Sequence, residues 1–105
     1  MVRPDKIQDL LFRIKLCIDH GAYFDTRHAI QRQKERQIGR LDIIYVLKNG
    51  YHEKRKDTFD EHYNAWNYAV RGKNIDRREI RVIISFDKNH MMIITAIELA
   101  SKETT

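Results

Sequence analysis

Apolar residues near the start of the chain recur at helical spacing. From Pro4 to His20 they lie three or four residues apart and fall on one stripe of a helix, at Ile7, Leu10, Leu11, Ile14 and Ile18. Pro4 suits a first helical turn, and Gly21 suits the position just after the last turn. The pattern predicts a helix over residues 4–20, followed by a short extended link over residues 22–25.

Two further helices are predicted before the middle of the chain. Asp25 or Thr26 can cap a helix that runs to about Gln37, although its only clearly apolar residues are Ala29 and Ile30. A third helix occupies residues 41–47 and ends at the Asn49-Gly50 pair. The thin apolar stripe of the second helix indicates that something other than burial explains its sequence.

After Tyr51 the apolar period changes from helical spacing to two, which is the period of a strand. The alternation predicts three strands, over residues 65–70, 80–86 and 91–97. A long loop is expected over residues 71–77, a short hairpin over 87–89, and a weaker fourth strand within 51–58. The predicted fold is α+β, with N-terminal helices packed on a three- to four-stranded antiparallel sheet whose last two strands are central.

Length and composition favour one cytoplasmic domain. A chain of 105 residues supports a single core, which we expect over about residues 4–99, with a polar tail at 100–105. Cys17 is the only cysteine, so no intramolecular disulfide can form, in keeping with a reducing compartment. No apolar run approaches the length of roughly 20 residues that spans a bilayer, and the charged start lacks the apolar core of a signal peptide. No membrane association is expected.

Positive charge is clustered along the chain. The formal net charge is +5, and basic residues outnumber acidic ones in the segments 27–40, 48–56 and 71–81. Such clusters attract polyanions, because each phosphate that they neutralise releases condensed counterions. A solvated face of a basic protein is the simpler alternative.

The second helix contains a histidine and two arginines at intervals of four residues. His28 and Arg32 stand one turn apart, and Arg36 lies one turn further. An imidazole can transfer protons near neutral pH, and a guanidinium can hold an anion with two parallel hydrogen bonds. The alternative is a structural histidine bonded to a backbone group, beside exposed arginines.

These residues resemble a bacterial family of small domains of unassigned function. The likeness rests on His28-Ala29-x-x-Arg32-x-x-x-Arg36, the Asn49-Gly50 helix end and the late Ile93-Ile94-Thr95 strand, and it covers about residues 7–98. Members look like relatives of the RelE superfamily of toxin-antitoxin ribonucleases, and the order of elements is similar to that of MqsR-type toxins. The resemblance implies a RelE-like domain that cuts messenger RNA and is neutralised by an antitoxin protein.

Metal-free RNA cleavage needs a base, an acid and cations around the phosphate. We expect His28 to act as base or acid, Arg32 and Arg81 to hold the phosphate, and Tyr68 to transfer a proton or stack on a base. Further contacts to nucleic acid are expected from basic residues outside this set, namely Arg36, Lys54, Arg55, Lys56 and Arg78.

No metal or cofactor is expected. The spacing of His52 and His62 matches no common zinc pattern, and the glycines are all isolated, so no phosphate-binding loop is present.

Two functions other than RNA cleavage can use the same clusters of positive charge. The chain can be a module that binds nucleic acid or an acidic protein without cleaving anything, or a structural partner in a small complex.

Overall fold

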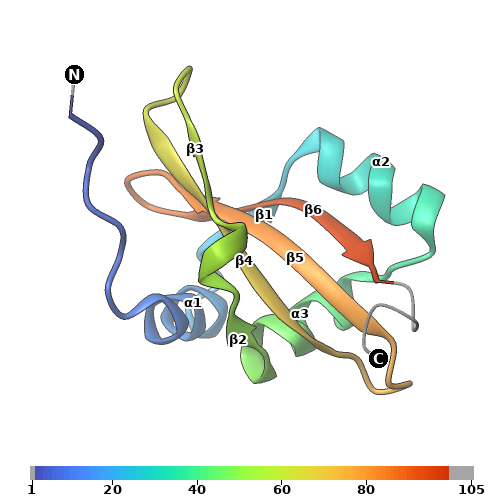
Figure 1. Cartoon of the computed structure of the whole chain (residues 1–105). Helices are drawn as coiled ribbons and strands as arrows, with labels where there is room; N and C mark the ends of the chain where they lie inside the picture. The colour runs from blue at the N-terminus through green and yellow to red at the C-terminus, as the bar shows by residue number, and fades with distance from the viewer. Residues whose placement is uncertain (1, 100–105) are drawn as a thin grey trace.

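The computed structural model describes residues 2–99, so the expected polar tail at 100–105 lies outside the described residues. The helices precede the three long strands, which confirms the predicted α+β class (Figure 1). In chain order, the elements are α1 Leu10–Asp19, β1 Tyr23–Asp25, α2 Arg27–Arg36, α3 Arg40–Asn49, β2 Tyr51–His52, the 3-10 turn η1 Lys54–Lys56, β3 Thr58–Asp60, β4 Ala65–Lys73, β5 Glu79–Phe86 and β6 Met91–Glu98.

The long strands β4, β5 and β6 form the predicted antiparallel meander. The full sheet has the order β1-β6-β5-β4-β2, with β3 also paired to β4 and β1 parallel to β6. It therefore has six strands, where three or four were expected. The additional strands contain two or three residues each, which is too short to display an alternation of apolar and polar positions.

The loop expected over residues 71–77 is shorter than predicted, because β4 continues to Lys73. Arg71, Gly72 and Lys73 pair with residues 81, 80 and 79 of β5. Gly72 is suited to this position because the end of α3 crosses β4 here. A Cβ atom on Gly72 would lie 3.0 Å from the Cα atom of Gly50.

Helix α1 begins at Leu10, six residues after the predicted start at Pro4. The segment before it is held by the sheet. The Pro4 carbonyl accepts a hydrogen bond from Trp66 Nε1 at 2.8 Å, and the Ile7 N–H donates to the Tyr68 hydroxyl at 2.9 Å. These bonds engage backbone groups that would otherwise have to be satisfied within a helix. Over residues 2–99, no helix has the length and apolar character that a membrane crossing requires.

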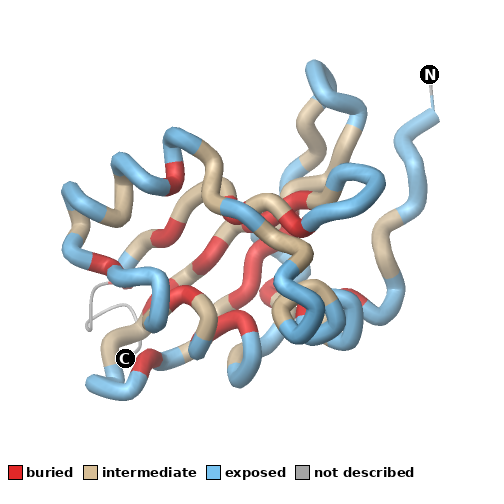
Figure 2. The backbone as a smooth tube through the Cα atoms, turned by 180° about the vertical axis from the view of Figure 1, so that it is seen from behind, coloured by how far each residue is buried: buried red, intermediate tan, exposed pale blue. Residues whose placement is uncertain are grey.

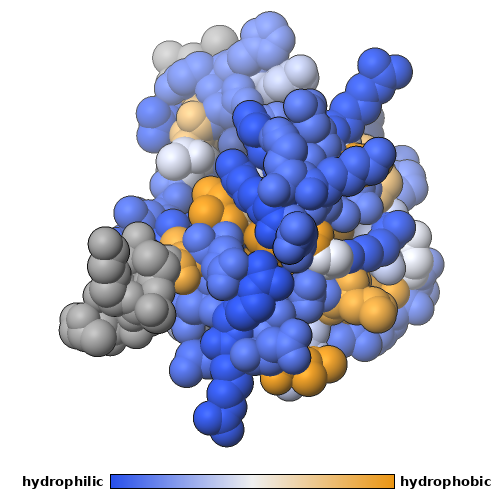
Figure 3. Space-filling model, turned by 90° about the vertical axis from the view of Figure 1, so that its right-hand side faces the viewer, coloured by the Kyte–Doolittle hydropathy of each residue, from blue (hydrophilic) through white to orange (hydrophobic). Residues whose placement is uncertain are grey.

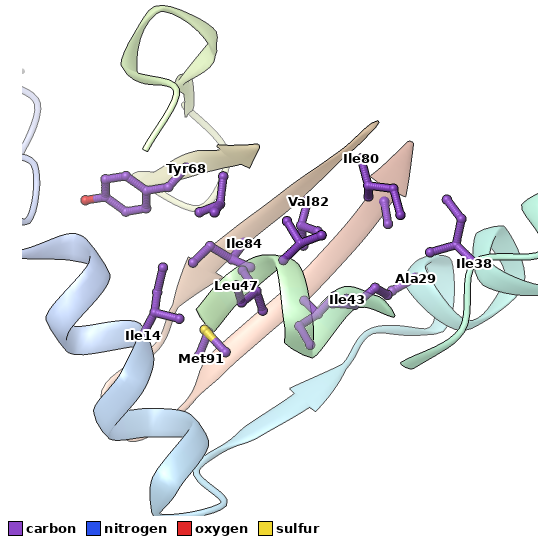
Figure 4. Packing of buried hydrophobic residues seen from close by; sticks show 14 of the residues in the cluster. Ile14, Ala29, Ile38, Ile43, Leu47, Tyr68, Ile80, Val82, Ile84 and Met91 are labelled. Carbon is purple, nitrogen blue, oxygen red and sulfur yellow. The ribbon is translucent and has the colours of Figure 1, made fainter. Parts of the chain in front are cut away.

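The core lies between the helices and one face of the sheet (Figures 2 and 4). Figure 4 shows side chains of the helices, such as Ile14, Ile43 and Leu47, on the same side of the sheet as Val82 and Ile84 of β5. The buried cluster comprises Leu10, Ile14, Ala29, Ile38, Ile43, Val46, Leu47, Tyr68, Val70, Ile80, Val82, Ile84, Met91, Ile93 and Ala96. We call the opposite side of the sheet the outer face. Because residues that pair across antiparallel strands point to the same side, Arg71, Arg81 and Ile97 form one row of the outer face, and Ala69, Ile83 and Thr95 form the next.

Candidate nucleic-acid interface

Helix α2 lies along the edge of β6, beyond the end of β1. Its N-cap residue Thr26 accepts a hydrogen bond from the Ala29 N–H through its side chain, and its own N–H donates to the Ile93 carbonyl at 3.0 Å. At the other end of the helix, Arg36 Nη1 donates to the Ala96 carbonyl at 2.8 Å and to Thr95 Oγ1 at 3.3 Å. Both ends of α2 are therefore bonded to β6, and Arg36 reaches a residue of the outer face.

We call His28, Arg32 and Arg36 the α2 ridge. His28 and Arg32 lie next to each other, as predicted. The Arg32 guanidinium donates a hydrogen bond from Nε to His28 Nε2 at 3.5 Å. His28 is exposed, and the Arg32 side chain keeps 37% of its surface accessible while it pairs with Glu35 at 2.7 Å. The imidazole and the guanidinium therefore lie next to each other at the surface of α2.

Arg78 extends this basic surface beyond the end of α2. Its guanidinium donates to the Gln37 carbonyl at 3.3 Å and to Glu98 at 2.7 Å, which joins the end of α2 to the end of β6. The hydrogen bond between Arg78 and Glu98 raises the pKa of the arginine and lowers the pKa of the glutamate. The side of the molecule on which α2 lies is predominantly hydrophilic (Figure 3).

Arg81 does not join the α2 ridge, although the two were expected to converge. It lies on the outer face, but its guanidinium is directed toward Glu53, beside β4, with Nε 2.6 Å from Oε1 and Nη2 3.2 Å from Oε2. The Glu53 backbone N–H is bonded to the Ala69 carbonyl of β4, and β5 and β6 separate this edge of the sheet from α2. Arg81 is therefore held by the Glu53 carboxylate, which lies at the edge of the sheet opposite to α2.

Tyr68 is also separate from the α2 ridge, because its side chain points to the core face of the sheet and not to the outer face. It is 3% exposed and belongs to the core, where its ring lies between His52 and Phe86. Its hydroxyl accepts the hydrogen bond from the Ile7 N–H. The expected grouping of His28, Arg32, Tyr68 and Arg81 therefore reduces to its two α2 members.

The basic triplet Lys54, Arg55 and Lys56 forms the 3-10 turn η1, and all three residues are exposed. This turn contacts β4, so it lies across the sheet from α2. The residues expected to bind nucleic acid thus fall into two groups at opposite edges of the sheet, with Arg36 and Arg78 in the group near α2.

Glu53 was not recognised as important from the sequence. Its carboxylate is 4% exposed and binds Arg71 at 3.1 Å as well as Arg81. The hydrogen bond from Arg81 is the main cause that lowers the pKa of Glu53, against the opposing effect of burial. The available signal was its position as the only acid among the bases of segment 48–56.

His52 was considered only as a weak zinc ligand, and the structure places it in a hydrogen bond with a carboxylate. Its Nε2 atom lies 2.7 Å from Oδ2 of Asp57, a fully buried carboxylate that also binds Lys6 at 3.0 Å. The other Asp57 oxygen accepts the Ala69 N–H at 2.9 Å. Asp57 thereby fastens the segment after η1 to β4, a role that favours structure over catalysis.

Comparison with known proteins gives the family. A family model described as a domain of unknown function, DUF4258, matches residues 26–98, which is more than half of the chain. The chain belongs to the DUF4258 family. The match begins at the N-cap of α2 and ends with the last residue of β6, so the α2 ridge and Glu53 lie inside the DUF4258 domain while α1 and β1 lie outside it. No curated protein and no solved structure matched the chain.

Proposed function

We propose that this DUF4258 domain is a metal-free endoribonuclease of the toxin type, which binds RNA along the α2 ridge and is neutralised by an antitoxin protein. The observation that carries the proposal is the contact between His28 and Arg32 at an exposed edge, next to an Arg36 that is anchored on Thr95. This arrangement places an imidazole beside one guanidinium group, with a second guanidinium group about two helical turns from the histidine, and a base together with cations is what cleavage of a phosphodiester needs.

In the proposed reaction, the Arg32 guanidinium turns from His28 to the phosphate, and the imidazole nitrogen that this movement frees removes the proton from a 2′-hydroxyl of RNA. The resulting oxygen attacks the adjacent phosphorus, the bond to the 5′-oxygen breaks, and that oxygen takes a proton from water; the imidazolium then gives its proton to the hydroxide that remains. The products are a 2′,3′-cyclic phosphate and a 5′-hydroxyl. Arg32 and Arg36 stabilise the negative charge on the phosphate oxygens, and Arg78 contacts a neighbouring phosphate.

A second candidate is a module that binds RNA along the same ridge without cutting it. Two observations favour this alternative. Arg32 is already paired with Glu35, and Tyr68, the second proton-transfer group expected from the sequence, lies on the other face of the sheet. A module that only binds RNA needs the cations of the α2 ridge but no second proton-transfer group.

Cleavage of a single-stranded RNA that carries a fluorophore and a quencher tests the proposal. The purified chain should cut this RNA in the presence of EDTA, and H28A should lower the rate at least about a hundredfold, because a positioned general base contributes at least that factor. Lys34→Gln is a matched control, since it removes a charge from an exposed residue of the same helix, two positions after Arg32. Its thermal midpoint and that of H28A should stay at the wild-type value.

Three outcomes separate the two functions. Cleavage that H28A abolishes and K34Q preserves supports the ribonuclease. RNA binding without any change of RNA length supports the binding module. Cleavage that H28A retains contradicts the role of His28.

In cells, a ribonuclease toxin should arrest growth on induction, and coexpression of a short adjacent gene should relieve the arrest if that gene encodes the antitoxin.

A further inference from the structure

The Glu53 carboxylate lies among three arginine side chains, at the edge of the sheet opposite to α2. Arg81 binds both of its oxygens, and Oε2 also accepts from Arg71 Nη1 at 3.1 Å and from Arg55 Nη2 at 3.3 Å. Four N–H donors therefore converge on one anionic group, one on Oε1 and three on Oε2.

This cluster has an excess of positive charge. Arg71 and Arg81 are 13% and 15% exposed, whereas Arg55 is 69% exposed, and within residues 2–99 the only other carboxylate bonded to the cluster is Glu79, at 2.8 Å from Arg71 Nε. Three guanidinium groups thus face two carboxylates within the described residues. Without the Glu53 charge, the two partly buried guanidinium groups, Arg71 and Arg81, would face only the Glu79 carboxylate, and the exposed Arg55 would add a further positive charge, which favours binding of another anion.

A guanidinium binds the two oxygens of a carboxylate and two non-bridging oxygens of a phosphate with the same parallel pair of hydrogen bonds. We propose that Arg55, Arg71 and Arg81 form a phosphate site that Glu53 occupies in the absence of nucleic acid, and that an RNA phosphate replaces the Glu53 carboxylate. The site is separate from the α2 ridge and deepens the proposed function by giving RNA a second contact across the sheet.

The surroundings of Glu53 suit such an exchange. It lies between the two-residue strand β2 and the exposed turn η1, and its backbone is bonded to β4 through the Ala69 carbonyl at 2.8 Å. The exposed Lys54 and Lys56 attract a polyanion to this turn. Because Glu53 competes for the same arginines, a free phosphate binds weakly, whereas an RNA that also contacts η1 binds more tightly.

Pyrophosphate binding to the full chain tests the site without RNA. Glu53→Gln keeps the side-chain length and removes the charge, so the dissociation constant for pyrophosphate should fall at least about tenfold, which corresponds to about 1.4 kcal/mol. The Nε–H resonance of Arg81 in ¹⁵N NMR spectra should shift during the titration. Glu79→Gln is the matched control, because it removes a carboxylate that binds Arg71 alone, and it should give a much smaller gain. Adding Arg81→Gln to E53Q should abolish the gain.

Equal gains in E53Q and E79Q, or no gain in E53Q, overturn the proposal. If E53Q does not fold, the wild-type chain decides the question, because millimolar pyrophosphate should still move the Arg81 Nε–H resonance and an unchanged resonance rejects the site. The inference rests on the proposed function only for the identity of the polyanion. A chain that binds pyrophosphate in this way but never cuts RNA keeps the site and loses the ribonuclease.

Discussion

At the scale of single residues, the close crossing of α3 and β4 depends on Gly50. A Cβ atom at this position would lie 2.5 Å from the Arg71 carbonyl oxygen and 2.7 Å from the Val46 carbonyl oxygen. Both neighbours are backbone atoms of regular elements, so neither can move aside without shifting a helix or a strand. The need for glycine here comes from the lack of space, since its backbone φ of −84° is open to any residue.

Gly50→Ala should therefore lower the free energy of unfolding by about 1–3 kcal/mol, the usual cost of overpacking. Urea denaturation followed by circular dichroism measures this change. Gly39→Ala is a suitable control, because the nearest atom to its added Cβ would be Asp42 Oδ2 at 3.7 Å, which is an ordinary contact. An alanine at Gly50 that is no more destabilising than one at Gly39 would contradict the close crossing.

At the scale of elements, α2 is notable because little of it is buried. Ala29 is its only buried residue, so the hydrophobic effect contributes little to its position. The helix depends instead on hydrogen bonds at its ends, through the Thr26 cap and through Arg36 on β6. This arrangement leaves the polar residues of the α2 ridge available at the surface.

Thr26→Ala should destabilise the chain by about 1 kcal/mol, because the Ala29 N–H loses its side-chain acceptor. Amide hydrogen exchange over residues 27–36 should increase more than exchange in α3, since α2 has less packing to compensate. Thr26→Ser keeps the hydroxyl and should restore most of the protection. Unchanged exchange in α2 of the alanine variant would show that packing holds this helix.

Helix and strand boundaries show how far local pattern determines an element. The long strands β5 and β6 were predicted within a residue or two, because their alternation extends over eight residues each. The start of α1 was predicted six residues too early, since the apolar Ile7 continues the helical spacing although its N–H is bonded to Tyr68. Competition from a strand 61 residues away is not visible in a local pattern.

At the scale of the whole molecule, ion pairs fasten the segments between the strands to the strands of the sheet. Glu53 connects β2 to β4 and β5, and the pair of Arg78 and Glu98 connects the β4–β5 loop to the end of β6. The pKa values of Glu53 and Glu98 are both lowered by the hydrogen bonds from these arginines. The backbone N–H groups of Asn89 and His90 likewise lower the pKa of Asp87 in the last hairpin.

These shifts give the direction of the pH dependence. A carboxyl group whose pKa is lower in the folded than in the unfolded chain stabilises the fold above its unfolded value, about 4, and this contribution is lost as the pH falls through the folded value. The free energy of unfolding should therefore decrease as the pH is lowered from about 5 to about 2. Urea titrations at several pH values measure how steeply the free energy of unfolding depends on pH. This dependence should be shallower in E53Q than in the wild type. An identical dependence would contradict the role of Glu53.

The sequence by itself determined the α+β class, the three helices, the meander of long strands and the nearness of His28 and Arg32. All of these follow from local periodicity and capping, which act between residues a few positions apart. Only the tertiary structure decided which charged groups meet and which face each side chain joins. Glu53 and Arg81 are 28 positions apart, Arg36 and Ala96 are 60 positions apart, and Tyr68 belongs to the core because the helices cover its face of β4. A side chain's partner depends on how distant elements pack, so neither the separation of Arg81 from the α2 ridge nor the three-arginine site was open to prediction from spacing.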